Sequence, residues 1–306
     1  MVTALVILPI VMVFQIGSLG ETMEIIENKN PTYLNLFTGT TTISIISLLA
    51  WGLGYFGQPH ILVRFMAIDS VKDISKARNI GISWMIFTVG GAMLVGLFGI
   101  AYLAKFDAET MTKFDGSKAL AETIFIYVSR VLFHPLIGGF LLSAILAAVM
   151  STISSQLLVT SSSMTEDIYR AFFNRQASAK TMLMVSRLSV LIVAVIALLL
   201  SLTPKDSILN LVGNAWAGFG AAFGPLILLS LLWKRTTAMG GLLGMIVGGA
   251  TVLLWVYLPH DHKDVYEMIP GFILGFLTIV IVSLLSKPVS KEVQDEFDEV
   301  AKIVKS

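Results

Sequence analysis

The sequence predicts an all-α polytopic membrane protein. Hydrophobic residues make up 56% of its 306 residues and charged residues only 13%, and the mean hydropathy is +0.83. A soluble domain of this length does not have such a composition. The absence of cysteine excludes a disulfide framework, a thiolate metal site and a thiol nucleophile. The net charge of +1 gives no reason to expect a nucleic-acid partner.

Eight apolar segments have spanning or near-spanning length, and we predict a helix for each. They cover about residues 2–18, 41–66, 80–104, 136–160, 181–203, 207–233, 239–258 and 268–286. The first is at the lower limit of a span and has no basic region before it, which argues against a secretory signal peptide. A chain that opens in mid-helix is expected to be the later part of a longer protein.

Basic residues of the loops favour one side of the membrane. Fourteen lysines and arginines belong to one set of loops and the tail: Arg64, Lys72, Lys76, Arg78, Arg170, Arg175, Lys180, Arg187, Lys234, Arg235, Lys287, Lys291, Lys302 and Lys305. The opposite loops hold seven. The positive-inside rule therefore places both ends of this chain on the cytoplasmic side of a cell inner membrane. The tail, 287–306, is then cytoplasmic, and its polar composition requires no role beyond solvation.

The second span contains a helix-breaking stretch. Three glycines and a proline occur between Gly52 and Pro59, and together they disfavour a continuous helix. Backbone groups freed by such a break cannot face lipid, so a broken helix commonly marks a transporter's substrate or ion site. Trp51, Tyr55 and Gln58 supply groups for stacking and hydrogen bonding there. The alternative is a structural helix with a proline kink.

The fourth span carries small and hydroxyl-bearing residues on one helical face, namely Ala148, Ser151, Thr152 and Ser155. Hydroxyl and carbonyl oxygens are the ligands that a dehydrated alkali cation needs. The alternative is helix packing, because small residues are common at membrane helix interfaces. In the sixth span the GxxxG of Gly220 and Gly224 favours close packing alone.

The loop from 105 to 135 places apolar residues four apart between Lys118 and Leu132, which predicts an amphipathic helix on the outer face. It is either a gate or a cover for the bundle. In another outer loop His260 and His262 lie near Asp261 and Asp264, but no further histidine is near them, and a metal site is the less favoured interpretation.

Several spans lack a charged side chain, among them 80–104 and 136–163. Proton-coupled carriers usually need a titratable group within the membrane, so sodium coupling is favoured over a proton relay. No Ser/His/Asp set, phosphate loop or HExxH motif is present. We therefore do not expect an enzyme.

Four long motifs now give a resemblance: WGLGYFGQPHI, RFMAIDS, LLSAILAAVMSTISSQLLVTSSSMTEDIY and AWAGFGAAFGP. In this order and spacing they closely resemble the bacterial proline-transporting members of the sodium/solute symporter family, over about residues 1–286. The resemblance implies a LeuT-like fold of two inverted five-helix repeats within thirteen helices. It matches this chain to the last eight helices: the end of the first repeat, the second repeat and two more.

The resemblance also implies roles for individual residues. Trp51, Tyr55 and Pro59 match the family's proline-binding positions on the broken helix. Ala148, Ser151 and Thr152 match its sodium ligands, with a backbone carbonyl from Ala148 and hydroxyls from the other two. The family completes both sites with the first helix of the first repeat, and no residue here matches that helix.

The expected function is sodium-coupled import of L-proline by alternating access, with sodium, L-proline, the lipid bilayer and the missing N-terminal helices as partners. Two alternatives stay open. The first alternative is that the chain is an inactive or regulatory truncated membrane fragment. The second is that it belongs to a sodium symporter for another small solute.

Overall fold

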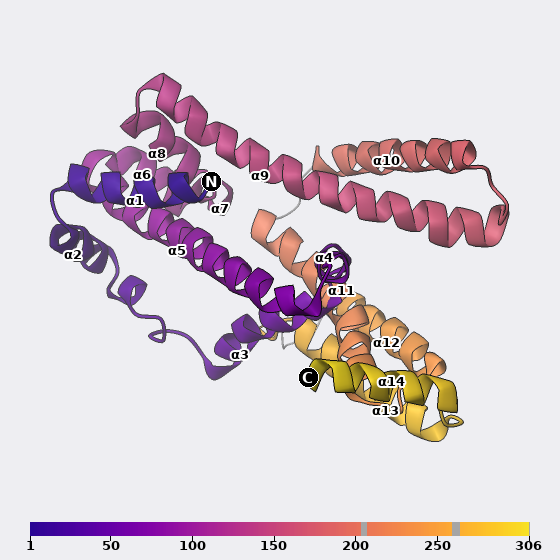
Figure 1. Ribbon diagram of the computed structural model, residues 1–306. Helices are drawn as coiled ribbons and strands as arrows, with labels where there is room; N and C mark the ends of the chain where they lie inside the picture. Colours follow the sequence, from indigo (N-terminus) through magenta and orange to yellow (C-terminus); the bar gives the residue numbers. More distant parts are fainter. Residues whose placement is uncertain (203–206, 259–263, 306) are drawn as a thin grey trace. The chain divides into compact units, whose positions relative to one another are not determined.

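The computed structural model describes residues 1–202, 207–258 and 264–305. Within these residues it contains helices and no strand (Figure 1), which confirms the all-α fold class. Six of the described helices are long and apolar enough to cross a membrane, and a seventh candidate is the bent pair Val2–Ile16 and Leu19–Lys29. The predicted second span is broken into shorter helices, so it does not count among the six. The number of eight spans stays a prediction.

The chain divides into two compact units. Unit 1 contains Met1–Gly39 and Ile68–Ser207, and unit 2 contains Thr40–Ala67 and Ile208–Ser306. The broken second span therefore belongs to unit 2, although the chain enters it from unit 1 and returns there. Each unit has its own packed interior and is described separately.

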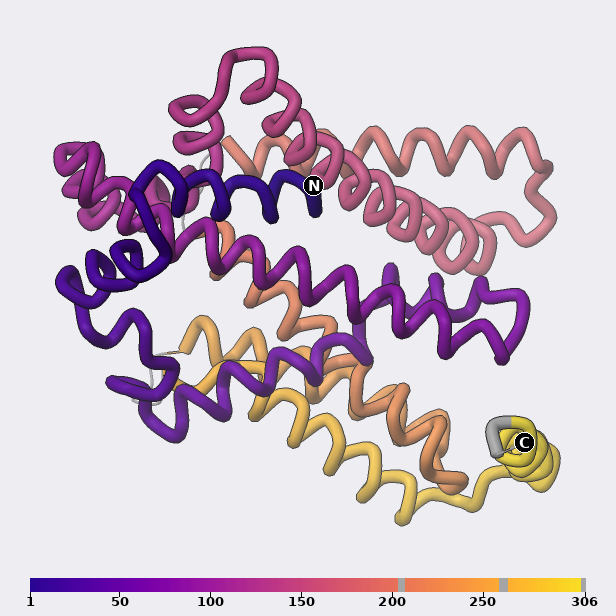
Figure 2. The backbone as a smooth tube through the Cα atoms, turned by 60° about the vertical axis from the view of Figure 1, so that its left-hand side comes forward, coloured from indigo at the N-terminus to yellow at the C-terminus, as the bar shows by residue number. Residues whose placement is uncertain are grey.

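Unit 1 is built around a helix of 33 residues, α5 (Ile74–Phe106). Helix α1 (Val2–Ile16) packs along it, and the shared core includes Leu8, Met12 and Val95, each at most 2% exposed. Helix α9 (Pro135–Ser162) continues as a π-helix, η4 (Ser163–Phe173), and α10 (Ala179–Ser201) returns beside it (Figures 1 and 2).

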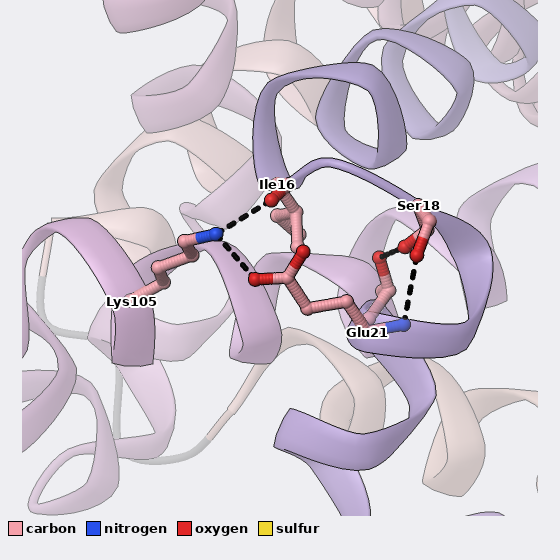
Figure 3. Close-up of polar contacts among 5 residues, drawn as sticks. Ile16, Ser18, Glu21 and Lys105 are labelled. Atoms are coloured by element: carbon pink, nitrogen blue, oxygen red, sulfur yellow. Dashed lines mark hydrogen bonds and ion pairs between the residues drawn. The ribbon is translucent and has the colours of Figure 1, made fainter.

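A sharp bend of 87° separates α1 from α2 (Leu19–Lys29). Gly17 forms the corner with φ 129°, a conformation that side chains other than glycine rarely adopt. Lys105 joins both sides of it, because its Nζ donates to the Ile16 carbonyl at 2.6 Å and to Glu21 Oε1 at 2.5 Å (Figure 3). A cation at the C-terminal end of α1 also complements the helix dipole. The predicted first span thus ends at this corner.

The predicted outer-face helix is interrupted. The structure has α7 (Lys118–Ala121) and α8 (Ile124–Leu132). Between these two helices, the Thr123 hydroxyl donates a hydrogen bond to the Leu120 carbonyl at 2.7 Å. Val128 is fully buried against α1 and α5, as the stripe predicts, but Leu120 is 44% exposed. The prediction of a single continuous helix was therefore wrong, since the hydrogen bond from the Thr123 side chain competes with the backbone hydrogen bonds of a helix.

Two more contacts hold this loop to its neighbours. Asp107 begins α6 (Ala108–Asp115) and accepts the backbone N–H of Thr110 at 3.0 Å. The Tyr127 hydroxyl of α8 donates to the other oxygen of Asp107 at 2.5 Å. These hydrogen bonds, chiefly the one from Tyr127, lower the pKa of Asp107 to about 2. The loop is thus fixed through an ionised carboxylate.

Unit 2 is a bundle of α11 (Ile208–Leu232), α12 (Ala238–Tyr257) and α13 (Met268–Leu285). Its helices approach closely at glycines, as small-residue packing in membranes requires. A Cβ on Gly224 would come within 2.8 Å of the Phe272 ring, and one on Gly220 within 2.7 Å of the Gly54 Cα. Both contacts confirm the close packing predicted for the GxxxG.

The tail contains a further helix, α14 (Lys291–Lys305). Its apolar residues gather on one side, so the expectation that the tail is only solvated was incomplete. The ion pair between Lys234 Nζ and Asp298 Oδ2, at 2.5 Å, connects it to the end of α11. The sequence signal was present in the spacing of Val293, Phe297 and Val300.

Candidate functional site

The broken span consists of α3 (Thr42–Ala50), the 3-10 helix η2 (Trp51–Gly57) and α4 (Pro59–Met66). Helical geometry is thus tightened at the glycines and restarts at Pro59. Proline suits the first position of α4 because it has no N–H to leave unpaired there. The predicted break is confirmed, and it is a 3-10 turn between two helices rather than a simple kink.

Glycines let η2 lie directly against α11. A Cβ on Gly57 would meet the Phe219 carbonyl and lie within 2.7 Å of the Gly220 Cα, and one on Gly54 would meet the Trp216 indole. Both glycines are buried. A side chain at either position would push the turn away from its neighbour.

Two hydrogen bonds cross between η2 and α11. The indole Nε1 of Trp216 donates to the Trp51 carbonyl at 3.0 Å. In return, Gln58 Nε2 donates to the Trp216 carbonyl at 3.2 Å, and Gln58 is 3% exposed. Buried backbone groups at a helix break need such partners. Side chains of α11 and of the turn itself therefore stabilise the unwound conformation.

Aromatic rings surround the turn. The ring of Trp51 is stacked with that of Trp216, at 5.7 Å and 16°, and with that of Tyr266, at 5.9 Å and 10°. Tyr55 meets Trp216 edge-on at 4.9 Å. The Tyr266 hydroxyl donates to the Gly213 carbonyl at 2.8 Å. Trp51 is thus fixed between its neighbours, whereas Tyr55, 39% exposed, presents its ring to the surroundings.

A carboxyl group lies next to this cluster. Glu267 precedes α13, and its Oε1 is buried without a hydrogen-bond partner among the described residues. Burial raises the pKa of Glu267 because water no longer stabilises its charge. Burial likewise raises the pKa of the Tyr266 hydroxyl. Burial at this end of unit 2 thus favours the protonated, uncharged forms of Tyr266 and Glu267.

The predicted sodium ligands lie on α9 in unit 1. Thr152 Oγ1 donates to the Ala148 carbonyl at 3.1 Å, and Ser155 Oγ donates to the Ser151 carbonyl at 2.9 Å. Ala148 thus belongs to an unbroken helix, so its carbonyl is not freed by a local break. Ser151 and Thr152 are exposed in this unit. Their oxygens share one face, as the spacing predicts.

The structure therefore brings Trp51, Tyr55 and Pro59 together on one turn and the three α9 residues together on one helix. The two groups lie in different units. The sequence contains no signal for two aromatic residues of this cluster: Trp216 beside a GxxxG motif is an ordinary packing residue, and Tyr266 belongs to none of the motifs. The histidines 260 and 262, with Asp261, lie outside the described residues.

Comparison with known proteins decides the family. Residues 1–248 match the model of the sodium:solute symporter family. The chain belongs to the sodium:solute symporter family.

Three known transport proteins are similar to the chain over nearly its whole length. The osmoregulated proline transporter OpuE of Bacillus subtilis is 55% identical over 100% of this chain and 61% of its own length. The high-affinity proline transporter PutP of the same organism is 53% identical over 98% and 61%. The sodium/proline symporter of Escherichia coli is 47% identical over 98% and 58%. The chain thus spans about three fifths of the length of these relatives.

Proposed function

We propose that this chain is part of a secondary active symporter that imports L-proline with sodium by alternating access. The observation that carries the proposal is the 3-10 turn η2, which interrupts an apolar helix, carries Trp51 and leaves Tyr55 exposed. Broken helices of this kind form the substrate sites of transporters with inverted repeats. Relatives named for proline transport support the choice of solute.

In this proposal proline lies against Tyr55 and Trp51, while Pro59 fixes the point where the helix restarts. Sodium is held by the Ala148 carbonyl and the hydroxyls of Ser151 and Thr152. Helices of an inverted repeat that lie outside this chain complete both sites. The relatives are long enough to contain such helices. The protein lies in the cell inner membrane, and both ends of this chain are cytoplasmic.

Thr152→Ala in the complete gene product tests the sodium assignment. Loss of one ligand hydroxyl to a cation raises the sodium concentration for half-maximal proline uptake by about 10- to 100-fold. Ser143→Ala is the matched control, because Ser143 is also on α9 and its hydroxyl also donates to a backbone carbonyl of the preceding turn. Equal sodium dependence of both variants and the unchanged protein would refute the assignment.

A second candidate is an inactive or regulatory membrane fragment; the chain covers about three fifths of the length of these relatives. An antibody against residues 291–306 distinguishes the two in the native cells. A band well above 33.2 kDa supports a complete symporter, and a band at 33.2 kDa supports the fragment. Competition by unlabelled amino acids and carboxylic acids then separates proline from another small solute.

A further inference from the structure

Helix α14 is amphipathic. Val293, Phe297, Val300 and Ala301 recur at the spacing of one helical face. The stretch 291–305 also contains three lysines and five carboxylates, which give it a net charge of −2. Such a helix is stable when its apolar face is covered and its charged face meets water.

A groove of about 550 Å³ lies along this apolar face. One wall belongs to α14 and the other to the end of α11. The apolar lining residues are Val293, Phe297, Val300, Ala301, Leu231 and Leu232, and the polar ones are Glu296 and Ser230. The two leucines are 64% and 75% exposed. Side chains of the protein therefore leave this apolar surface uncovered within unit 2.

The helix is held at this end of the bundle. Between Leu285 of α13 and Lys291 of α14 lie five residues, 286–290, which reach at most about 18 Å when extended. The ion pair between Lys234, just after α11, and Asp298, the residue after Phe297, holds α14 to the end of α11. Helix α11 is long and apolar enough to span a membrane, and its two exposed leucines are at the end of this candidate span.

We propose that an acyl chain of a membrane phospholipid occupies the groove between α14 and the end of α11. The lining is mostly apolar, and apolar surface left in water is unfavourable in proportion to its area. An anionic headgroup does not explain binding, since the helix is itself acidic and anionic lipids attract basic segments. Helix α14 thus lies in the interface of the bilayer, with its charged face toward water.

Site-directed spin labelling tests the proposal, because the chain contains no cysteine. Phe297→Cys and Val300→Cys place the label in the groove, and Glu299→Cys places it on the charged face as the matched control. The probes are oxygen, which enters lipid, and a water-soluble nickel complex. We expect labels at 297 and 300 in phosphatidylcholine vesicles to collide more with oxygen and less with nickel than the label at 299.

The accessibility pattern also identifies the occupant. The same values in vesicles containing phosphatidylglycerol are expected for an acyl chain, and dependence on the anionic lipid would overturn that choice. Nickel access at 297 and 300 equal to that at 299 would mean a water-filled groove, which contradicts the proposal. Protection from both reagents would mean protein, such as a second copy, and would contradict it too. Solute uptake does not enter the measurement, so the result is independent of the proposed function.

Discussion

At the scale of single residues, the indole of Trp216 organises the turn that carries Trp51 and Tyr55. Its N–H donates to the carbonyl of Trp51, the first residue of the 3-10 turn, and its ring contacts both aromatic residues. Tyr266 contacts Trp51 as well. Small changes at Trp216 are therefore transmitted to both proposed proline contacts.

Trp216→Phe keeps an aromatic ring and removes the hydrogen bond to the Trp51 carbonyl. Loss of one such bond is worth about 0.5–1.5 kcal/mol, so we expect the KM for proline to rise by about 2- to 10-fold. Trp255→Phe is the matched control, since its Nε1, on α12, donates to the Val265 carbonyl at the same 3.0 Å and does not bond to η2 itself. Uptake kinetics measure both, and equal KM values would contradict the positioning role.

Glu267→Gln is expected to stabilise unit 2 at neutral pH. Burial raises the pKa of Glu267 above its ordinary 4.5, so the folded state holds its proton more tightly than the unfolded chain. Stability from this group is then present below that value and is lost as the pH rises. The thermal midpoint of Glu267→Gln should exceed that of the unchanged protein at about pH 7, with a smaller difference at about pH 4. Exposed Glu292→Gln should show no such trend.

At the scale of elements, close backbone approach explains the broken span. Gly54 and Gly57 allow η2 to touch α11, and Pro59 restarts the helix without an orphan N–H. In unit 1 the α1–α2 corner depends in a similar way on Gly17 and on the Lys105 contacts. Glycine and proline therefore mark where these helices change direction.

Gly57→Ala is expected to destabilise the protein by about 1–3 kcal/mol, because a Cβ there overlaps the backbone of α11. Gly52→Ala belongs to the same turn but meets no atom within 4 Å, and it should be neutral or stabilising by up to about 1 kcal/mol. Thermal unfolding of both variants in detergent measures the difference. A similar loss for both would show that η2 does not depend on contact with α11.

At the scale of the whole molecule, the proposed topology places opposite loops on opposite sides of the membrane. Lys72→Cys and Lys118→Cys each introduce a single exposed cysteine into a chain that has none. A membrane-impermeant maleimide should label Lys118→Cys in intact cells and Lys72→Cys only in inside-out vesicles. Labelling of both from one side would refute the orientation.

The sequence by itself determined the helical membrane class, the break at Gly52–Pro59 and the shared face of Ala148, Ser151 and Thr152. These follow from composition, helix-breaking residues and helical period, which are local properties. Tertiary structure decided that Trp216 and Tyr266 surround Trp51 and that α14 forms a groove with α11. Such contacts join residues far apart in the chain, and a local sequence pattern contains no information about them.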